Sequence, residues 1–120
     1  MRRMLVALLL IAGAVPAHAD ALEDFDATIL RSFIILKCHG DQDKADQEVM
    51  ARVDVVKKAA LDQLWGQFDK ANPSRHEANG KTAQATLDKR IEAHDLFIQS
   101  QVTEYGCDWL DGKAFQPAGN

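Results

Sequence analysis

Cys38 and His39 are the neighbouring residues whose types could most directly do chemistry, and Cys107 is the second cysteine of the chain. A cysteine beside a histidine is compatible with a nucleophile, a metal site, a haem attachment site or half of a disulfide. Haem attachment needs two cysteines before the histidine, and a thioredoxin-like site needs a Cys-x-x-Cys sequence; the chain has neither. We therefore favour a disulfide between Cys38 and Cys107.

The N-terminal segment predicts export, which bears directly on the state of these cysteines. Arg2 and Arg3 precede an apolar run over residues 4–15, which is too short to span a bilayer well. The sequence Ala-His-Ala at 17–19 then matches a small-x-small cleavage signal. We expect a Sec signal peptide over residues 1–19, a periplasmic or secreted location, and no stable membrane insertion after cleavage.

An oxidising compartment favours the bridge over the other uses of Cys38. A thiolate metal site would have to stay reduced there. A cysteine protease would need a base and a scaffold that a helical chain of this length rarely supplies. His39 is then expected to be a solvated residue near a helix end, where its cation is favoured by the helix dipole.

Other stretches resemble ligand sites only weakly. The acidic stretch 41–48 begins like a calcium loop, but Asp46 stands where the loop needs glycine and Arg52 where it needs glutamate. The acidic and histidine residues around His76 and His94 lack a His-Glu-x-x-His spacing. The sequence therefore predicts no metal site, no cofactor and no catalytic residues, and we do not expect an enzyme.

The charge of the chain argues against nucleic acid as a partner. There are 18 acidic residues against 14 Lys and Arg, which gives a net charge of −4. Removal of residues 1–19 takes away Arg2 and Arg3, so the net charge becomes −6. Such a chain is repelled by phosphates, and no basic patch offsets that repulsion.

Helical periodicity dominates the rest of the sequence and predicts an all-α protein. We expect helices over about residues 20–37, 43–71 and 81–105, within a helical domain at 20–110 and a flexible C-terminal tail at 111–120. The core-facing stripe of the first helix is Leu22, Phe25, Ile29, Phe33 and Leu36. The stripe of the second is Val49, Val53, Val56, Ala60, Leu64 and Phe68. The stripe of the third is Ala83, Leu87, Ile91, His94, Ile98, Val102 and Tyr105.

The expected ends of these helices follow from capping residues. Gly40 and Gly106 are suited to the position after a helix, and Asp41 or Asp43 can cap the second helix. Pro73 should end that helix at Asn72. We place Asn79-Gly80 in the loop before the third helix, with a short extra turn at 74–77.

Short connections predict that the three helices pack up-down-up. The C-terminal ends of the first and third helices then lie at the same pole, which brings Cys38 and Cys107 together. The expected fold is an up-down-up three-helix bundle with one disulfide joining those two ends. The enclosed loop is long, so the chain-entropy estimate for the bridge is about 4 kcal/mol.

The first helix is apolar on nearly all sides in its C-terminal half. Three apolar residues lie off its core stripe, namely Leu30, Ile34 and Ile35. With Trp109 they could form a surface that binds a protein partner or a second copy of the chain. The alternative is that they are covered by Trp109, Leu110 and Phe115 from the C-terminal segment.

His94 is a polar residue on an apolar stripe, between Ile91 and Ile98. It could be a hydrogen-bonded histidine of the core or its boundary, or a pH sensor. A neutral imidazole among aliphatic side chains would be forced to ionise as the pH falls, which would destabilise the fold.

These features predict a small exported, non-catalytic binding protein of the bacterial periplasm, of the inhibitor or immunity type. The alternative is a periplasmic acid-stress or pH-responsive chaperone. The general plan of small size, helices and one bridge is similar to that of some periplasmic acid-stress chaperones and of immunity proteins against cell-wall-degrading effectors. The resemblance is one of architecture and includes no shared motif.

Overall fold

The computed structural model describes residues 21–40 and 43–112, and helices account for nearly all of them. The elements are α2 (Ala21–Ile34), the π-helix η1 (Ile35–His39), α3 (Lys44–Ala71), the 3₁₀-helix η2 (Pro73–Arg75), α4 (His76–Tyr105) and α5 (Cys107–Gly112). No strand occurs in these ranges. The all-α prediction is confirmed. The expected signal peptide at 1–19 lies outside the described residues, and so does the expected tail at 111–120 except for Asp111 and Gly112, which belong to α5.

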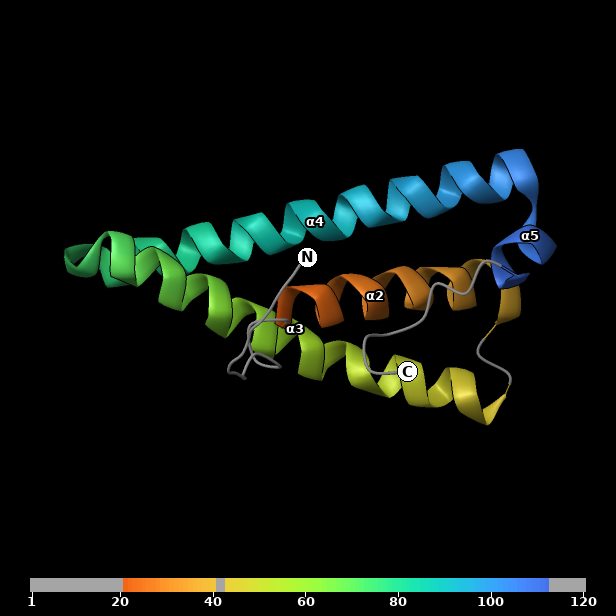
Figure 1. Ribbon diagram of the computed structural model, residues 1–120, viewed down its shortest axis with the longest axis horizontal. Helices are drawn as coiled ribbons and strands as arrows, with labels where there is room; N and C mark the ends of the chain where they lie inside the picture. Colours follow the sequence, from red (N-terminus) through yellow and green to blue (C-terminus); the bar gives the residue numbers. More distant parts are fainter. Residues whose placement is uncertain (1–20, 41–42, 113–120) are drawn as a thin grey trace, which may run out of the picture.

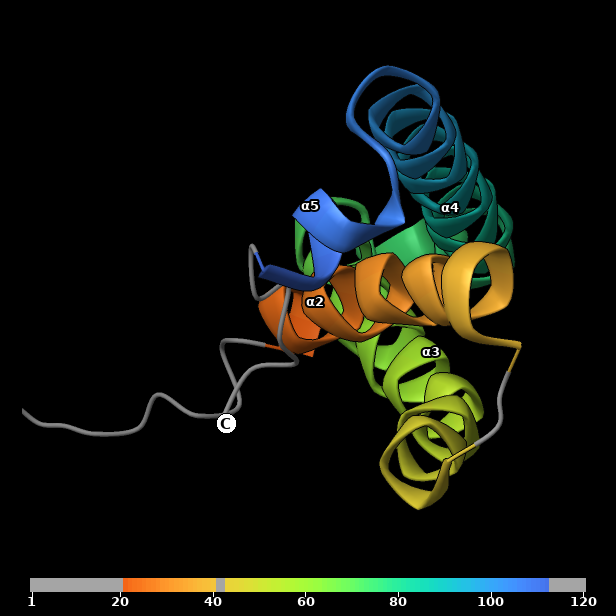
Figure 2. The same ribbon diagram turned by 90° about the vertical axis from the view of Figure 1, so that its right-hand side faces the viewer.

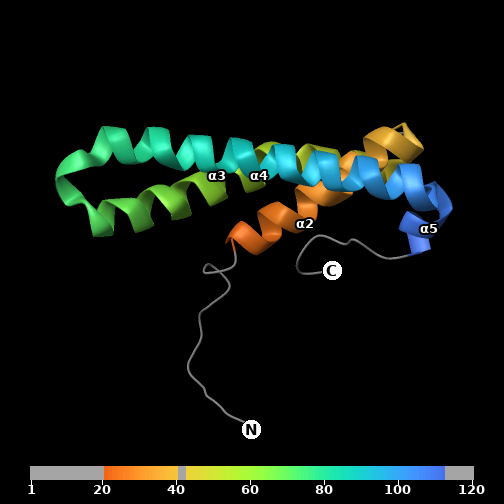
Figure 3. The ribbon, with the colours of Figure 1, turned by 90° about the horizontal axis from the view of Figure 1, so that it is seen from above.

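The long helices α3 and α4 form a hairpin, and α2 packs against both of them. The two long helices meet at η2 and diverge toward their other ends, where α2 lies between them (Figure 1). The end-on view shows α4 and α3 on opposite sides of α2, with α5 beside it (Figure 2). From above, the hairpin extends well beyond the start of α2 (Figure 3). The up-down-up bundle is therefore present, with α5 as an additional short helix.

Most helix boundaries follow from the residues expected to set them. The side chain of Asp43 caps α3 and accepts a hydrogen bond from the backbone N–H of Asp46 at 2.9 Å. Gly40 and Gly106 follow η1 and α4 with φ angles of 74° and 84°, which glycine adopts without a side-chain clash. α3 ends at Ala71, with Asn72 as its cap before Pro73.

The expected start of the third helix is wrong by five residues, because α4 begins at His76 and already contains Asn79 and Gly80. The Asn79 side chain donates hydrogen bonds to Asp69 Oδ1 and to the Asn72 carbonyl, each at 2.9 Å. A Cβ atom on Gly80 would lie only 2.4 Å from the ring of Trp65. Contacts with α3 thus hold in a helix two residues that on their own favour a turn.

The turn end of the hairpin is held by contacts between Trp65, Asp69 and His76. The indole N–H of Trp65 donates to the His76 carbonyl at 2.8 Å, and the two rings stack with centroids 4.8 Å apart. His76 Nδ1 lies 2.8 Å from Asp69 Oδ2. The hydrogen bond from Asn79, followed by that from His76, lowers the pKa of Asp69 against the opposing effect of burial.

Two groups of buried side chains form the core. The larger one joins α2, α3 and α4. Its members are Phe25, Ile29, Val56, Ala60, Leu64, Ala83 and Leu87. The smaller one, near the disulfide, consists of Ile34, Ile98 and Leu110. The predicted stripes supply every member of the larger group. Two stripe residues were placed wrongly, because Leu36 is 57% exposed and Tyr105 is 50% exposed.

The π-helix η1 explains why Leu36 is exposed. The backbone N–H of Gly40 bonds to the carbonyl of Ile35 at 2.9 Å, a five-residue step that is wider than an α-helical turn. The extra residue in this turn changes the rotation of the side chains around the helix axis. Ile34 and Ile35 are therefore fully buried, and the next residue, Leu36, points outward.

Candidate functional site

The disulfide Cys38–Cys107 is present and joins η1 to the start of α5. The two Cα atoms lie 5.6 Å apart although 69 positions separate them in the sequence. No free cysteine occurs among the described residues. The predicted bridge between the C-terminal ends of the first and third helices is confirmed.

The bridge holds α5 against the end of the bundle, and this corrects the expected partner surface. Leu110 is fully buried and packs with Ile34 and Ile98. Ile34 and Ile35 are themselves 0% exposed, and Leu30 is half-buried against the same group. The expectation that Leu30, Ile34 and Ile35 form an exposed patch is therefore wrong, because Leu110 covers this group, as the alternative interpretation held.

Exposed apolar side chains at this end of the molecule are Leu36 on η1 and several residues of α4 and α5, among them Leu96 at 59% exposure. Phe97, Tyr105 and Trp109 are 43%, 50% and 38% exposed. Phe97, Gln101 and Tyr105 follow each other at intervals of four residues, so they lie in one row along α4. The rings of Tyr105 and Trp109 stack with centroids 4.6 Å apart. We call Phe97, Tyr105 and Trp109 the aromatic ridge.

Acidic residues surround the aromatic ridge. Residues 91–112 contain five acidic residues and neither Lys nor Arg. Glu104 directly precedes Tyr105 and Asp108 directly precedes Trp109, and both carboxylates are exposed. Lys37 reaches this end of the molecule from η1 and pairs with Asp95 at 3.1 Å. The ridge is therefore an apolar strip on a negatively charged part of the surface.

Sequence reasoning identified Trp109 as a contact residue and missed Phe97 and Tyr105. Phe97 lies about 100° away from Ile98 on the helical wheel, which puts it outside the core stripe of α4. An exposed phenylalanine on an otherwise polar helix face was the available signal for this residue. Tyr105 does lie on the stripe, but it occupies the last turn of α4, where the end of the stripe is only partly covered.

His94 lies at the contact between α4 and α2 and is not enclosed by aliphatic side chains. Its Nε2 atom lies 2.7 Å from Asp26 Oδ1, and Arg90 donates hydrogen bonds to both oxygens of Asp26. An ionised carboxylate only accepts hydrogen bonds, so Nε2 carries the proton. The purely aliphatic surroundings on which the expected histidine sensor rested are therefore not present, because the ring faces a carboxylate.

The carboxyl group of Asp26 is the titrating group that this contact changes most. Burial by itself would raise its pKa, but the hydrogen bonds from Arg90 and His94, together with their positive charges, outweigh burial and hold the pKa below its usual value. The carboxylate is thus stabilised by its two partners on α4.

Three further pairs of charged or titratable side chains connect α2 and η1 to α3. Asp46 on α3 is nearly buried; its Oδ2 atom lies 2.8 Å from His39 Nδ1, and Arg31 approaches Oδ1 at 3.8 Å. Arg52 on α3 donates to Asp24 on α2 at 2.9 Å. His39 is therefore a half-buried partner of Asp46, and its expected role as a solvated residue is wrong.

Metal-binding clusters and membrane spans are both absent from the described residues. Residues 21–40 and 43–112 contain no group of three or more His, Cys, Asp or Glu side chains that could hold a metal ion. None of the helices in the same ranges is both long enough and apolar enough to cross a bilayer. Two shallow, open depressions lie at residues 74–78 beside the hairpin turn and around Val55 on α3.

No protein family model, curated protein sequence or solved structure matches this chain. The aromatic ridge and the three groups of paired side chains are therefore interpreted from their own physical chemistry, because no similar protein provides a role for them.

Proposed function

We propose that this chain is a small exported, non-catalytic protein that binds a protein partner through the aromatic ridge, as an inhibitor or immunity protein does. The observation that carries the proposal is the grouping of Phe97, Tyr105 and Trp109 at one end of the molecule, each more than a third exposed. Large aromatic side chains are enriched at the energetic centres of protein interfaces.

The way the ridge is held supports this proposal. Tyr105 belongs to the last turn of the 30-residue helix α4, and Trp109 belongs to a helix attached to the bundle by Cys107 and by the buried Leu110. The stack between Tyr105 and Trp109 restricts both side chains before any partner arrives. Binding then loses less side-chain entropy than binding through a flexible surface would.

The same contacts suit an exported protein. The disulfide is the covalent attachment of α5, and disulfides persist in oxidising compartments such as the periplasm. The sequence at 1–19 supports export to such a compartment. In a reducing compartment this cross-link between η1 and α5 would be lost.

Site-specific photo-crosslinking in the native host tests the proposal. A photoreactive phenylalanine analogue replaces Phe97 in one strain and Val55 in another; Val55 is 66% exposed on α3 and serves as the matched apolar control. We expect a discrete adduct with another protein from position 97 and none from position 55. Equal labelling of many proteins from both positions, or no adduct from position 97, would contradict the proposal.

An acid-responsive chaperone is the second candidate, and the ion pairs of α2 favour it. Asp26 joins α2 to Arg90 and His94 on α4, and the hydrogen bonds and charges of these partners lower its pKa against the effect of burial. Protonation of Asp26 would weaken the attachment of a helix whose buried face includes Phe25 and Ile29. Such a chaperone should prevent aggregation of an unfolded test protein near pH 3 and not at pH 7; equal activity at both values would exclude this mechanism.

A further inference from the structure

We propose that the partner is a basic protein, and that it places a Lys or Arg side chain against the Tyr105–Trp109 stack. The inference rests on the proposed binding function and specifies the chemistry of the partner. It is carried by the combination of stacked aromatic rings and adjacent carboxylates at one end of the molecule.

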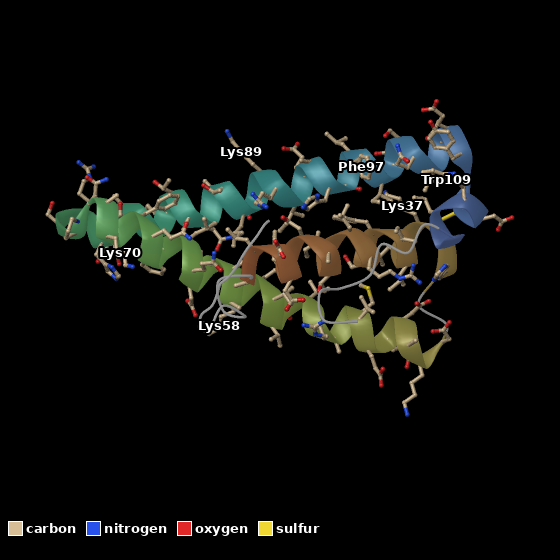
Figure 4. All side chains as sticks on the ribbon, viewed as in Figure 1. Lys37, Lys58, Lys70, Lys89, Phe97 and Trp109 are labelled. Carbon is tan, nitrogen blue, oxygen red and sulfur yellow. A yellow bond between two sulfur atoms is a disulfide. The ribbon has the colours of Figure 1, made fainter. Side chains whose placement is uncertain are left out.

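Charge is distributed unevenly along the bundle. Residues 91–112 contain five acidic residues and no Lys or Arg. Lys70, Lys81 and Lys89 lie nearer the turn that joins α3 to α4. Figure 4 shows Lys58, Lys70 and Lys89 toward the end where α3 and α4 meet. Phe97 and Trp109 lie toward the opposite end, which carries the disulfide. Lys37 also lies toward the disulfide end, where it is paired with Asp95. The field at the ridge is therefore negative and attracts a positively charged surface.

The geometry of the stack suits a cation. Tyr105 and Trp109 lie with ring centroids 4.6 Å apart and an angle of 28° between their planes. An ammonium or guanidinium group is attracted to the faces of such rings, most strongly to indole. The carboxylates of Glu104 and Asp108 are exposed and belong to the same helix ends as the two rings, so they add negative charge to this part of the surface. Rings and carboxylates together recognise Lys or Arg better than either alone.

The same charge disfavours three other occupants of the ridge. A second copy of this chain is itself acidic, with a net charge of −4 for the full sequence, so the copies repel each other. Nucleic acids and anionic membrane surfaces carry charge of the same sign as the residues around the ridge. A basic protein surface is the macromolecular occupant with complementary charge.

The test uses the protein captured at position 97, purified and titrated against the full exported chain by calorimetry. The double variant Glu104→Lys/Asp108→Lys reverses the charge beside the stack. Glu48→Lys/Asp54→Lys changes the net charge equally on α3, where both residues are exposed. We expect about a tenfold or larger loss of affinity for the first variant and less than about a twofold loss for the second. The wild-type affinity should fall as salt is raised to about 0.5 M.

The neutral variant Glu104→Gln/Asp108→Asn repeats the test without introducing a new positive charge near α5. Equal losses for the two lysine variants, or an affinity independent of salt, would overturn the inference while leaving the binding function in place. A captured protein that is acidic, or a second copy of this chain, would do the same. An internal adduct with residues of this chain and no other protein would contradict the proposed function as well. Failure to capture any protein at position 97 contradicts the proposed function itself.

Discussion

The Nε2 atom of His94 lies 2.7 Å from Oδ1 of Asp26, and this contact joins the middle of α4 to the first half of α2. Arg90 binds the same carboxylate. Together they make the ionised state of Asp26 part of what holds α2 to the hairpin. We therefore assign the acid sensitivity of the fold to the carboxylate of Asp26 on α2. The sequence analysis had considered His94 as the pH-sensitive residue instead.

We expect this contact to make stability depend on pH in the acid range. The pKa of Asp26 is lowered in the folded state, so its contribution is present above the unfolded value near 3.9 and is lost as the pH falls through the folded value. Asp26→Asn should lower the free energy of unfolding by about 1–2 kcal/mol at pH 7. In urea titrations between pH 7 and about pH 2, the difference in the free energy of unfolding between the wild type and Asp26→Asn should become smaller as the pH falls.

Asp54→Asn is the control for that experiment, because Asp54 is an exposed carboxylate on α3. Its effect on unfolding should stay within about 0.5 kcal/mol at every pH. A difference between wild type and Asp26→Asn that is the same at pH 7 and pH 2 would show that the ionised carboxylate is not what the contact stabilises.

Adjacent residues in η1 should respond oppositely to the same substitution. Ile35 is 0% exposed and Leu36 is 57% exposed. Ile35→Lys places a charge in the core and should cost at least about 3 kcal/mol or prevent folding, whereas Leu36→Lys should change stability by less than about 0.5 kcal/mol. Thermal melts of the two variants measure this. Similar melting temperatures for the pair would contradict the π-helical register.

Two helical glycines provide a second matched pair. A Cβ atom at Gly80 would meet the Trp65 ring at 2.4 Å, whereas at Gly66 no atom lies within 4 Å. Alanine favours a helix interior over glycine by about 1 kcal/mol. Gly66→Ala should therefore raise the melting temperature and Gly80→Ala should lower it, as scanning calorimetry can determine. A stabilised Gly80→Ala variant would mean that Trp65 is not packed against α4 in this way.

Loss of the disulfide should detach α5 and disturb the aromatic ridge. The bridge closes a loop of 69 positions, for which the chain-entropy estimate is about 4 kcal/mol of stability. Cys38→Ser/Cys107→Ser should melt many degrees lower and lose near-ultraviolet circular dichroism from the Tyr105–Trp109 stack. Reductant should have the same effect on the wild type. An unchanged melting temperature in reductant would exclude a stabilising role for the bridge.

The sequence sufficed to predict the helices, the bundle and the bridge, because each depends on a local or periodic signal. Phe25, Val56 and Leu87 repeat at helical spacing with the other stripe residues, and all are buried. The start of α4 could not be predicted in this way, since Asn79 and Gly80 are helical only through contacts with α3. Local propensity does not contain such tertiary contacts.

The candidate site was harder to predict because it depends on two small departures from regular geometry. The π turn buries Ile35 and exposes Leu36, and helical periodicity predicts the opposite. The short helix α5 then brings Leu110 over the residues that had been interpreted as a partner surface. Neither feature has a spacing signal in the sequence. The sequence pointed to Trp109, and the place of Phe97 off the core stripe was a signal, but the stack of Tyr105 on Trp109 becomes visible only in three dimensions.

The affinity of the Phe97→Ser variant for the protein captured at position 97 tests the central claim most directly. Phe97 is 43% exposed, so its replacement should shift the melting temperature by no more than a few degrees. If the aromatic ridge is the binding surface, calorimetry should show an affinity at least about tenfold weaker, while Val55→Ser binds like the wild type. An unchanged affinity for Phe97→Ser in a folded variant would contradict the assignment of the ridge as the binding surface.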